Sequence, residues 1–165
     1  MNNKEVAQIV AGWTQKEALK GQMIAKSSEE IVGEMKSGQY VLFSHDNGEP
    51  LSYCRLITWG NEKPWVEVGS LVVDEDSRKH GIGSETAMAA IKLADELFPG
   101  AEVFALAENE KSHGLLTKIG GTEIANTALP TQVWDLCHQV DKECQHWGFF
   151  PRCMCKAFSL THLAP

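Results

Sequence analysis

The chain has 165 residues, of which 43% are hydrophobic and 22% are charged, the balance of an ordinary globular protein. Its formal net charge of −7 and its isoelectric point near 5.3 argue against a nucleic-acid partner and against an anionic membrane surface. No apolar run approaches the ~18 residues of a membrane span, and Lys4, Glu5 and Gln8 stand where a signal peptide needs a continuous apolar stretch. We therefore expect no membrane or nucleic-acid partner, a cytoplasmic location, and a single domain over residues 1–165.

The first half of the chain predicts two helices followed by an antiparallel meander. Apolar residues at helical spacing cover residues 3–20, and a capping box that joins Ser27 to Glu30 opens a second helix that runs to about residue 35. An Asp-Asn-Gly hairpin turn and a polar turn containing Pro64 separate the short apolar runs that follow. Strands are therefore expected at residues 40–44, 51–59 and 65–73.

The second half of the chain predicts an alternation of helices and strands. A long helix is expected up to residue 97, and the apolar run at 102–107 predicts the next strand. Because a helix separates this strand from the strand at 65–73, we expect the two to be parallel neighbours. A further helix at 109–118 and a strand pair at 122–124 and 132–136 complete the predicted sheet.

A glycine-bearing turn joins the strand at 65–73 to the long helix. Its sequence is Arg78-Lys79-His80-Gly81-Ile82-Gly83-Ser84. The backbone N–H groups of such a turn converge with the positive end of the helix on one spot, where they can hold a phosphate group. The turn lacks the Gly-Lys-Ser/Thr ending of a P-loop, and a Rossmann turn needs an earlier glycine. The alternative is that the glycines serve only a tight turn and a helix start.

The turn resembles the acetyl-CoA pyrophosphate loop of the GCN5-related N-acetyltransferase (GNAT) family, whose signature is Gln/Arg-x-x-Gly-x-Gly/Ala. Val73 lies five positions before Arg78, where the family usually has a strand-ending valine. The family's second signature is matched by Asn109, Leu115, Ile119 and Gly120. The resemblance covers about residues 27–136. It implies an α/β (α+β) fold with a mixed, mostly antiparallel central sheet flanked by helices.

The resemblance also implies acetyl-CoA as the cosubstrate. In this family the pantetheine arm lies between two splayed strands, so the backbone groups of Leu71, Val72 and Val73 are expected to pair with it. A backbone N–H at or beside Leu71 is then expected to stabilise the tetrahedral oxyanion. Residues 78–84 would hold the pyrophosphate, and Asn109 and Ser112 would line the far side of the cofactor.

Glu67 is the candidate general base. It lies eleven positions before Arg78 in an otherwise apolar strand, a spacing similar to that of the catalytic glutamate in several branches of the family. The acetylation of an amine needs a neutral nitrogen, so a base must take a proton from an ammonium group, directly or through water. The alternative is a carboxylate on the solvated face of the strand, because Glu67 alternates with the apolar residues Val66 and Val68.

Two positions depart from the family's second signature. Leu116 stands where the family commonly has a tyrosine whose hydroxyl protonates the leaving thiolate, and Gly121 replaces the usual phenylalanine. His113 could supply the proton instead. The alternative is that His113 is an ordinary solvent-exposed histidine on a helix. The leading hypothesis is transfer of an acetyl group to a primary amine of a small molecule or amino acid. The alternative is a non-catalytic module that binds acyl-CoA.

The acceptor and the tail are less constrained by the sequence. The helix start at Ser27-x-x-Glu30 and the strand around Glu67 are also similar to N-acetylglutamate synthase-type domains, which points to an amino acid or a small amine.

The tail at 137–165 holds Cys137, Cys144, Cys153 and Cys155. These thiols could bind zinc, but they form no Cys-x-x-Cys pair, so we favour thiols without metal. The apolar residues 147–151 could cap the substrate groove or contribute to a homodimer contact.

Overall fold

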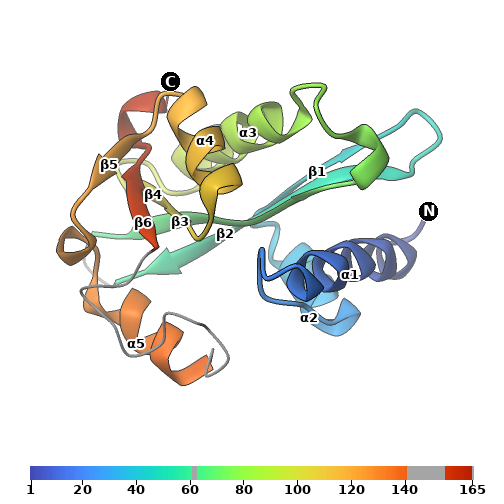
Figure 1. The fold of residues 1–165 in the computed structure, drawn as a ribbon, viewed down its shortest axis with the longest axis horizontal. Coiled ribbons are helices and arrows are strands. Elements are labelled where there is room, and N and C mark those ends of the chain that lie inside the picture. Colours follow the sequence, from blue (N-terminus) through green and yellow to red (C-terminus); the bar gives the residue numbers. More distant parts are fainter. Residues whose placement is uncertain (61–62, 141–154, 165) are drawn as a thin grey trace.

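The computed structural model describes residues 1–60, 63–140 and 155–164. A six-stranded sheet in the order β1-β2-β3-β4-β6-β5 runs through the molecule, with helices on both of its faces (Figure 1). Only the β3–β4 pair is parallel among the strand pairs of the described residues. This is the mixed, mostly antiparallel sheet that the sequence predicts.

The bounds of the elements follow the predicted ranges closely, with one exception described below. The strands are β1 (Tyr40–Ser44), β2 (Pro50–Trp59), β3 (Trp65–Val73), β4 (Glu102–Ala107), β5 (Thr122–Ile124) and β6 (Lys156–Ser159). The helices are α1 (Asn3–Leu19), α2 (Ser28–Ser37), α3 (Ile82–Leu97), α4 (Glu110–Lys118) and α5 (Thr131–Val140). Within the described residues, none of the helices has the length and apolar character needed to cross a membrane.

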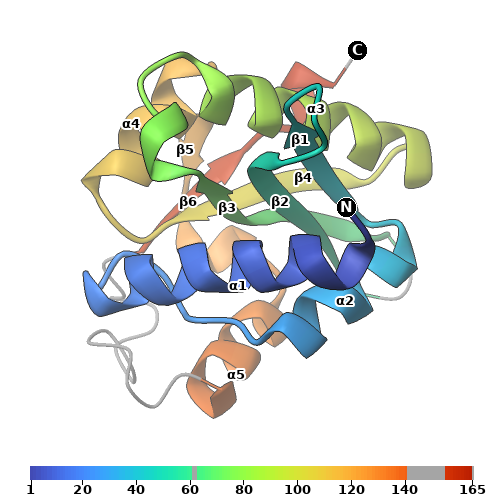
Figure 2. The ribbon, with the colours of Figure 1, turned by 90° about the vertical axis from the view of Figure 1, so that its right-hand side faces the viewer.

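Helices α1 and α2 cover one face of the sheet beside β2 and the end of β3 (Figures 1 and 2). The predicted capping box opens α2: the Ser27 backbone N–H donates to Glu30 Oε2 over 2.7 Å, and the Glu30 N–H donates to Ser27 Oγ over 3.2 Å. Ile31 of α2 and Val10 of α1 are fully buried against Tyr53 and Val72. The first-turn caps and this apolar contact together fix the two helices on the sheet.

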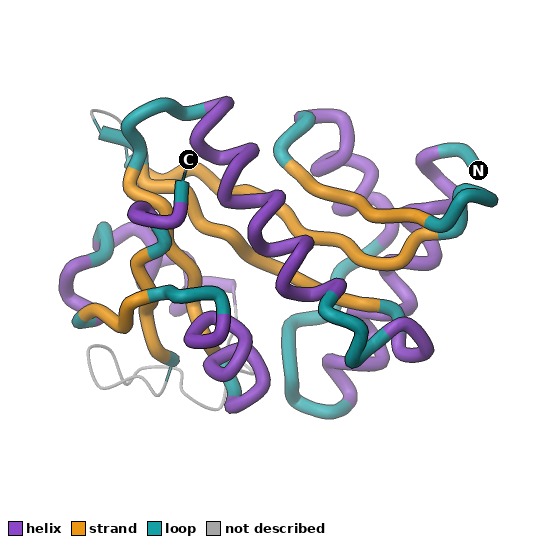
Figure 3. Tube along the Cα trace, turned by 90° about the horizontal axis from the view of Figure 1, so that it is seen from above, coloured by secondary structure: helices purple, strands orange, loops and turns teal. Residues whose placement is uncertain are grey.

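Helix α3 covers the opposite face, crossing the strands diagonally (Figure 3). Its buried side is made of small residues and one isoleucine, Ala87, Ala90, Ile91 and Ala94. Ala90, Ile91 and Ala94 belong to the largest core cluster together with Val66, Val68 and Val103. Small side chains let the helix approach the sheet closely, so the glycine-bearing turn that precedes α3 lies directly at the end of β3.

The prediction of a strand at 132–136 is wrong. These residues belong to α5, and the partner of β5 is β6, which lies between β4 and β5 in the sheet. Val133 and Trp134 are both buried in the same cluster with Phe104. Adjacent residues of a strand point to opposite faces, whereas adjacent residues of a helix can share one buried side. A helix, and not a strand, therefore allows both adjacent side chains to be buried in the same cluster.

Strands β3 and β4 pair only at their beginnings. Residues 65–67 pair with residues 102–104, and beyond them the two strands diverge (Figure 3). A bulge in β3 lies just past the last pair: Tyr53 faces Val72, whereas Arg55 faces Gly69, so residues 70 and 71 share one position on β2. Ser70 has a positive φ of 52°. The bulge bends β3 away from β4 and opens a wedge between the two strands.

Gly121 follows α4 at a point with no room for a side chain. A Cβ atom there would lie 2.9 Å from the Leu116 carbonyl oxygen and 2.9 Å from Leu160 Cδ2. We therefore expect Gly121→Ala to lower the free energy of unfolding by about 1–3 kcal/mol, measured by urea denaturation.

The matched control is Gly114→Ala in the preceding helix α4, where a Cβ would meet nothing within 4 Å. Alanine replaces glycine in an exposed helix position there, so stability should rise by up to about 1 kcal/mol. Equal effects of the two substitutions would contradict the packing seen at Gly121.

Candidate functional site

Glu67 lies on the open face of β3, between two defined neighbours. Its Oε2 accepts a hydrogen bond of 3.1 Å from the Trp59 indole N–H. Its Oε1 lies on the other side, 3.2 Å from the place that a Cβ at residue 69 would occupy. Gly69 therefore leaves the space into which the carboxyl group leans. The side chain is half-buried on the same face of the sheet as α1, α2 and α5.

The surroundings of Glu67 act on its proton affinity in opposite directions. Burial raises the pKa of Glu67 above its ordinary value, and this effect is the largest. The positive charges of Arg55 and Lys26 and the Trp59 hydrogen bond oppose it. The net result is a raised pKa, as a base that must take a proton near neutral pH requires.

A half-buried ionic cluster lies beside Glu67 and was not predicted from the sequence. Glu34 Oε1 on α2 accepts from Arg55 Nη1 over 2.7 Å and from Lys26 Nζ, and Glu34 Oε2 accepts from the Tyr53 hydroxyl over 2.7 Å. These donors hold the pKa of Glu34 below its usual range although burial works to raise it. Tyr53 and Arg55 alternate with apolar residues in β2. This alternation was the sequence signal that could have predicted a polar face on the strand.

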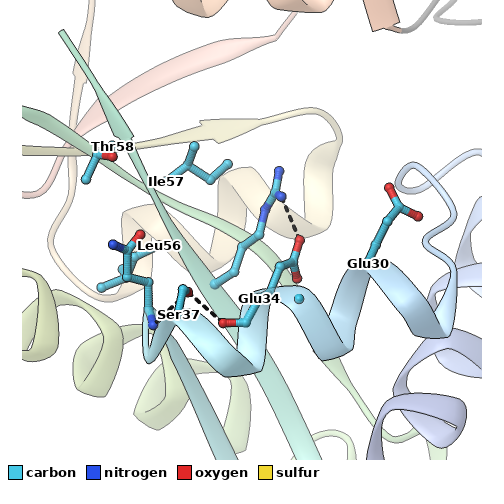
Figure 4. Close-up of a pocket in the computed structure, with 9 residues that line it drawn as sticks. Glu30, Glu34, Ser37, Leu56, Ile57 and Thr58 are labelled. Atoms are coloured by element: carbon cyan, nitrogen blue, oxygen red, sulfur yellow. Dashed lines mark hydrogen bonds and ion pairs between the residues drawn. The ribbon is translucent and has the colours of Figure 1, made fainter. Parts of the chain in front are cut away.

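A pocket of about 440 Å³ opens between α2 and β2 beside this cluster. Figure 4 shows Glu34 pointing from α2 toward β2, with Glu30 one helical turn away. Ile57 lines the pocket and is also the cross-strand partner of Glu67. A molecule in the pocket would therefore reach the strand position next to the Glu67 carboxyl.

The wedge lies beyond Glu67 along β3. Val66 and Val68 pack toward α3, but after the bulge Leu71 and Val73 face α3 and Val72 faces α1. The bulge thus reverses which side chains point to which face. It also interrupts the hydrogen-bond ladder with β2 at residues 70 and 71, which leaves backbone groups there without regular pairing.

The turn before α3 has the backbone of a phosphate cradle. Gly81 caps α3 with a positive φ of 87° and no side-chain acceptor, and Lys79 also has a positive φ, of 68°. His80 Nδ1 lies 3.4 Å from the Ser77 carbonyl oxygen within the turn. A Cβ at Gly83 would meet only ordinary contacts, at 3.6 Å or more. Residues 79–83 thus combine left-handed conformations with a free helix N-terminus.

Arg78 is committed to holding this turn in place. Its Nε and Nη2 each donate to the Val73 carbonyl oxygen over 3.1 Å, and Nη2 also donates to Glu17 Oε1 over 3.0 Å. Lys20 reaches the same Glu17 oxygen over 3.0 Å. The side chain of Arg78 therefore ties α1 to the end of β3, and the backbone of the turn and Lys79 are left as the groups that can meet a phosphate.

Asn109 and Ser112 cap α4 at the other side of the wedge. The Asn109 carboxamide oxygen accepts from the backbone N–H groups of Lys111 and Ser112, each over 3.0 Å. Ser112 Oγ in turn accepts from the Asn109 N–H. Asn109 Nδ2 donates to the Gln22 carbonyl oxygen over 3.0 Å, which joins the α1–α2 loop to the start of α4. Both side chains are thus committed to capping in this structure.

The residues that depart from the family signature lie outside the wedge. Leu116 is buried in the core with Phe158. His113 lies edge-on to Phe158 and has Nε2 3.5 Å from Glu123 Oε2 on β5. The tail interpretation falls largely outside the described residues, which include the side chain of Cys155 but not those of Cys137, Cys144 and Cys153. Among the described residues, no three His, Cys, Asp or Glu side chains gather to hold a metal.

A sheet with one parallel pair that splays beyond a bulge, followed by a glycine-bearing turn and a helix, defines the class of acyl-CoA N-acyltransferase folds. The model of the acetyltransferase (GNAT) family matches residues 6–121. The chain belongs to this family.

Individual relatives are more distant. The UPF0039 protein C11D3.02c of Schizosaccharomyces pombe is 29% identical over 96 residues, which are 58% of this chain and 62% of that protein. The chain therefore spans about three-fifths of the length of the curated relative that it matches.

Solved structures confirm the fold. N-acetylglutamate synthase from Neisseria gonorrhoeae, complexed with coenzyme A and N-acetyl-glutamate, is similar with a TM-score of 0.69 and 17% identity, over 92% of this chain and 31% of that one. Rv2747 from Mycobacterium tuberculosis, in complex with CoA and a second ligand, has a TM-score of 0.66 and 16% identity, over 94% and 93% of the two chains.

The tie between Glu17 and Arg78 makes a prediction about stability. Burial raises the pKa of Glu17, but the hydrogen bonds from Lys20 and Arg78 outweigh it and hold the pKa below its usual value. A depressed pKa stabilises the fold above the unfolded-state pKa, and this contribution is lost as the pH falls through the folded-state pKa. We expect Glu17→Gln to cost about 1–2 kcal/mol at pH 7 in urea denaturation, and the difference to shrink below about pH 4.

Glu96→Gln provides the comparison, because Glu96 is exposed on α3 and forms only a 3.8 Å pair with Lys92. It should change the free energy of unfolding by less than about 0.5 kcal/mol at either pH. A cost of Glu17→Gln that does not depend on pH would show that the ion pair with Arg78 is not its source.

Proposed function

We propose that this protein is an acetyl-CoA-dependent N-acetyltransferase that acts on the primary amine of a small molecule or amino acid. The observation that carries the proposal is the order of groups along β3. A half-buried carboxyl with a raised pKa, Glu67, precedes the bulge at Ser70. The segment Leu71–Val73 follows, which lies beyond the pairing with β4, and the Gly81 turn closes the series. These groups follow the order in which a transferase needs them: a base for the amine, a binding strand for the thioester end of the cofactor, and a turn for its pyrophosphate.

The cofactor is proposed to lie in the wedge. The diverging backbones of β3 and β4 offer N–H and C=O groups at Leu71, Val72 and Val73 to an extended pantetheine arm, which would pair as an added strand. The turn from Arg78 to Ser84 offers backbone N–H groups of its middle part, residues 79–83, together with the helix N-terminus and the Lys79 charge to the pyrophosphate, because the N–H groups of Arg78 and Ser84 already donate to Glu75 and Gly81. Arg78 contributes by holding the turn against Val73 and Glu17.

The proposed reaction is a direct attack of the amine on the thioester. Glu67 takes a proton from the ammonium group, directly or through water, and the neutral nitrogen forms a bond to the carbonyl carbon. A backbone N–H of the bulge, at or beside Leu71, stabilises the oxyanion. The C–S bond then breaks, the nitrogen loses its second proton to water as the amide forms, and the thiolate of coenzyme A takes a proton from water, because Leu116 supplies none.

An amino acid or a small amine is the proposed acceptor. The pocket beside Ile57 is about 440 Å³ in volume, which suits a small molecule, and its wall carries both carboxylates and a guanidinium. Glu30 and Glu34 can face an ammonium group, and Arg55 can face a carboxylate. The likeness to N-acetylglutamate synthase supports this substrate class only through the fold, since the two chains are 17% identical.

The first test is the release of free thiol from acetyl-CoA with free amino acids, their amides and aliphatic diamines as acceptors. We expect at least one amine to accelerate release, and Glu67→Gln to lower kcat by about 10²–10⁴-fold. Acetyl-CoA binding, measured by calorimetry, should be unchanged. Glu96→Gln, which lies away from the site on α3, should leave kcat unchanged.

If no amine accelerates thiol release while acetyl-CoA still binds, the enzyme proposal is wrong. The chain would then be a non-catalytic module that binds acyl-CoA, which the replacement of tyrosine by Leu116 favours.

The second test concerns the proposed phosphate cradle. Gly81 has a φ of 87°, which costs a residue with a side chain about 1–2 kcal/mol. We expect Gly81→Ala to weaken acetyl-CoA binding about tenfold, because the strained turn moves its N–H groups. Gly83→Ala should change binding less than about twofold, because its Cβ would make only ordinary contacts. Equal losses in both variants would place the pyrophosphate elsewhere.

A further inference from the structure

The half-buried ionic cluster beside β2 lines the proposed acceptor pocket, but it takes no part in the proton and acetyl transfer described above. It joins Lys26 from the α1–α2 loop, Glu34 from α2, and Tyr53 and Arg55 from β2. Taking charges out of water costs free energy, and an ion cluster is usually no more stable than an apolar core of the same volume. Stability alone therefore does not explain why these charges lie next to Glu67.

The register of the sheet directs Arg55 toward Glu67. Arg55 is the cross-strand partner of Gly69, and Glu67 is the partner of Ile57, so the two side chains are diagonal neighbours on the same face. Gly69 has no side chain, and Glu67 Oε1 leans over its place. No side chain at residue 69 therefore separates the guanidinium from the carboxyl.

The positive charge of Arg55 is only partly neutralised by Glu34. Only its Nη1 meets Glu34, over 2.7 Å, and that carboxylate is shared with Lys26 and Tyr53. Arg55 Nε is buried without a hydrogen-bond partner among the residues that the structure describes. Glu34 thus faces two cations, and their positive charge also acts on the two neighbouring acids, Glu30 and Glu67.

We propose that Arg55, held in place by Glu34, is the positioning residue that keeps the Glu67 carboxyl ionised and ready to accept a proton. This inference rests on the proposed function of Glu67 as the base. Trp59 fixes one carboxyl oxygen by a hydrogen bond, and the charge of Arg55 acts on the other through the space above Gly69. Glu34 sets how much of that charge reaches Glu67.

Other ionisable groups around Glu67 do not duplicate this role. Lys26 acts in the same direction as Arg55 but more weakly. Cys54 lies on the other face of β2, where burial first and the nearby Glu67 charge second raise its pKa to about 12, so it stays neutral. In the described part of α5, Asp135 is the charged side chain, and it is exposed.

The test uses two substitutions with opposite expected effects on the pH profile of kcat/KM. Arg55→Met removes a positive charge beside Glu67, so its pKa rises and the acidic limb should move to higher pH by about half a unit or more. Glu34→Gln removes the negative charge that neutralises Arg55 and Lys26, so the pKa of Glu67 falls and the limb should move to lower pH. Arg55→Lys keeps the charge and should leave the limb near its wild-type position.

Lys92→Met serves as the control, because Lys92 is an exposed cation on α3. It should move neither the limb nor the rate. Opposite shifts cannot come from a general loss of folding, which lowers the rate without a consistent change in the limb. An unchanged limb in both Arg55→Met and Glu34→Gln, with only the rate reduced, would overturn the proposal.

A second measurement separates this inference from the proposed reaction. The titration of the Glu67 carboxyl carbon can be followed by NMR in protein labelled with ¹³C at glutamate carboxyls, with the signal assigned by its loss in Glu67→Gln. The same opposite shifts are expected there. If the wild-type protein acetylates no amine but the NMR shifts occur, the proposed function fails and the coupling stands. If turnover is present and the titration does not move, the coupling fails alone.

Discussion

The bulge at Ser70 is the constraint on which the site depends. Strands β3 and β4 are parallel neighbours in the sheet, connected by α3. If β3 were regular, its pairing with β4 would continue along the whole of β4. Instead the pairing stops after Glu67, and the extra residue bends β3 and reverses the facing of its side chains. Ser70 adopts a left-handed φ that costs a non-glycine residue of the order of 1–2 kcal/mol, so the surrounding packing must hold it there.

That packing comes from three directions. Val66 and Val68 hold the first half of β3 against α3, and Val72 holds the second half against α1. Arg78 then binds the carbonyl oxygen of Val73 and joins it to Glu17, which fixes the end of the strand to the same helix. Because the bulge changes which residues face each layer, β3 cannot straighten without breaking the contact of Val72 with α1 or the contacts of Leu71 and Val73 with α3. The wedge is therefore a property of the whole fold and not of a single loop.

The sequence predicts most of this architecture because its signals are local. The Ser27–Glu30 capping box and the glycine-bearing turn act within a few residues, and both lie where they were expected. The strand predicted at 132–136 failed because a short run with a tryptophan fits either period, and only the burial of both Val133 and Trp134 against Phe104 decides for a helix. The place of β6 between β4 and β5 was equally out of reach, since no local pattern encodes a pairing across so many residues.

The site was predictable in its backbone and less so in its side chains. Glu67 stands out as a charge in an apolar strand, but the partners that tune it come from α2, from β2 and from the α1–α2 loop. For Arg78 the signature predicts a charge that faces phosphate, and the structure shows which partners that side chain has here, Glu17 and the Val73 carbonyl oxygen. The acid with which an arginine pairs depends on where the helices pack. The spacing of residues along the chain does not predict this pairing.

The α1–α2 loop connects these separate features. Residues at or near this loop reach the Gly81 turn through Glu17 and Arg78, the start of α4 through Gln22 and Asn109, and the ionic cluster through Lys26 and Glu34. Both walls of the wedge and the charges behind Glu67 are thus tied to one segment. A group that enters the wedge and draws Asn109 away from Gln22 releases one of the three ties. The shape of the wedge and the charges around Glu67 thus depend on contacts made by the same part of the chain, although their residues lie far apart in the sequence.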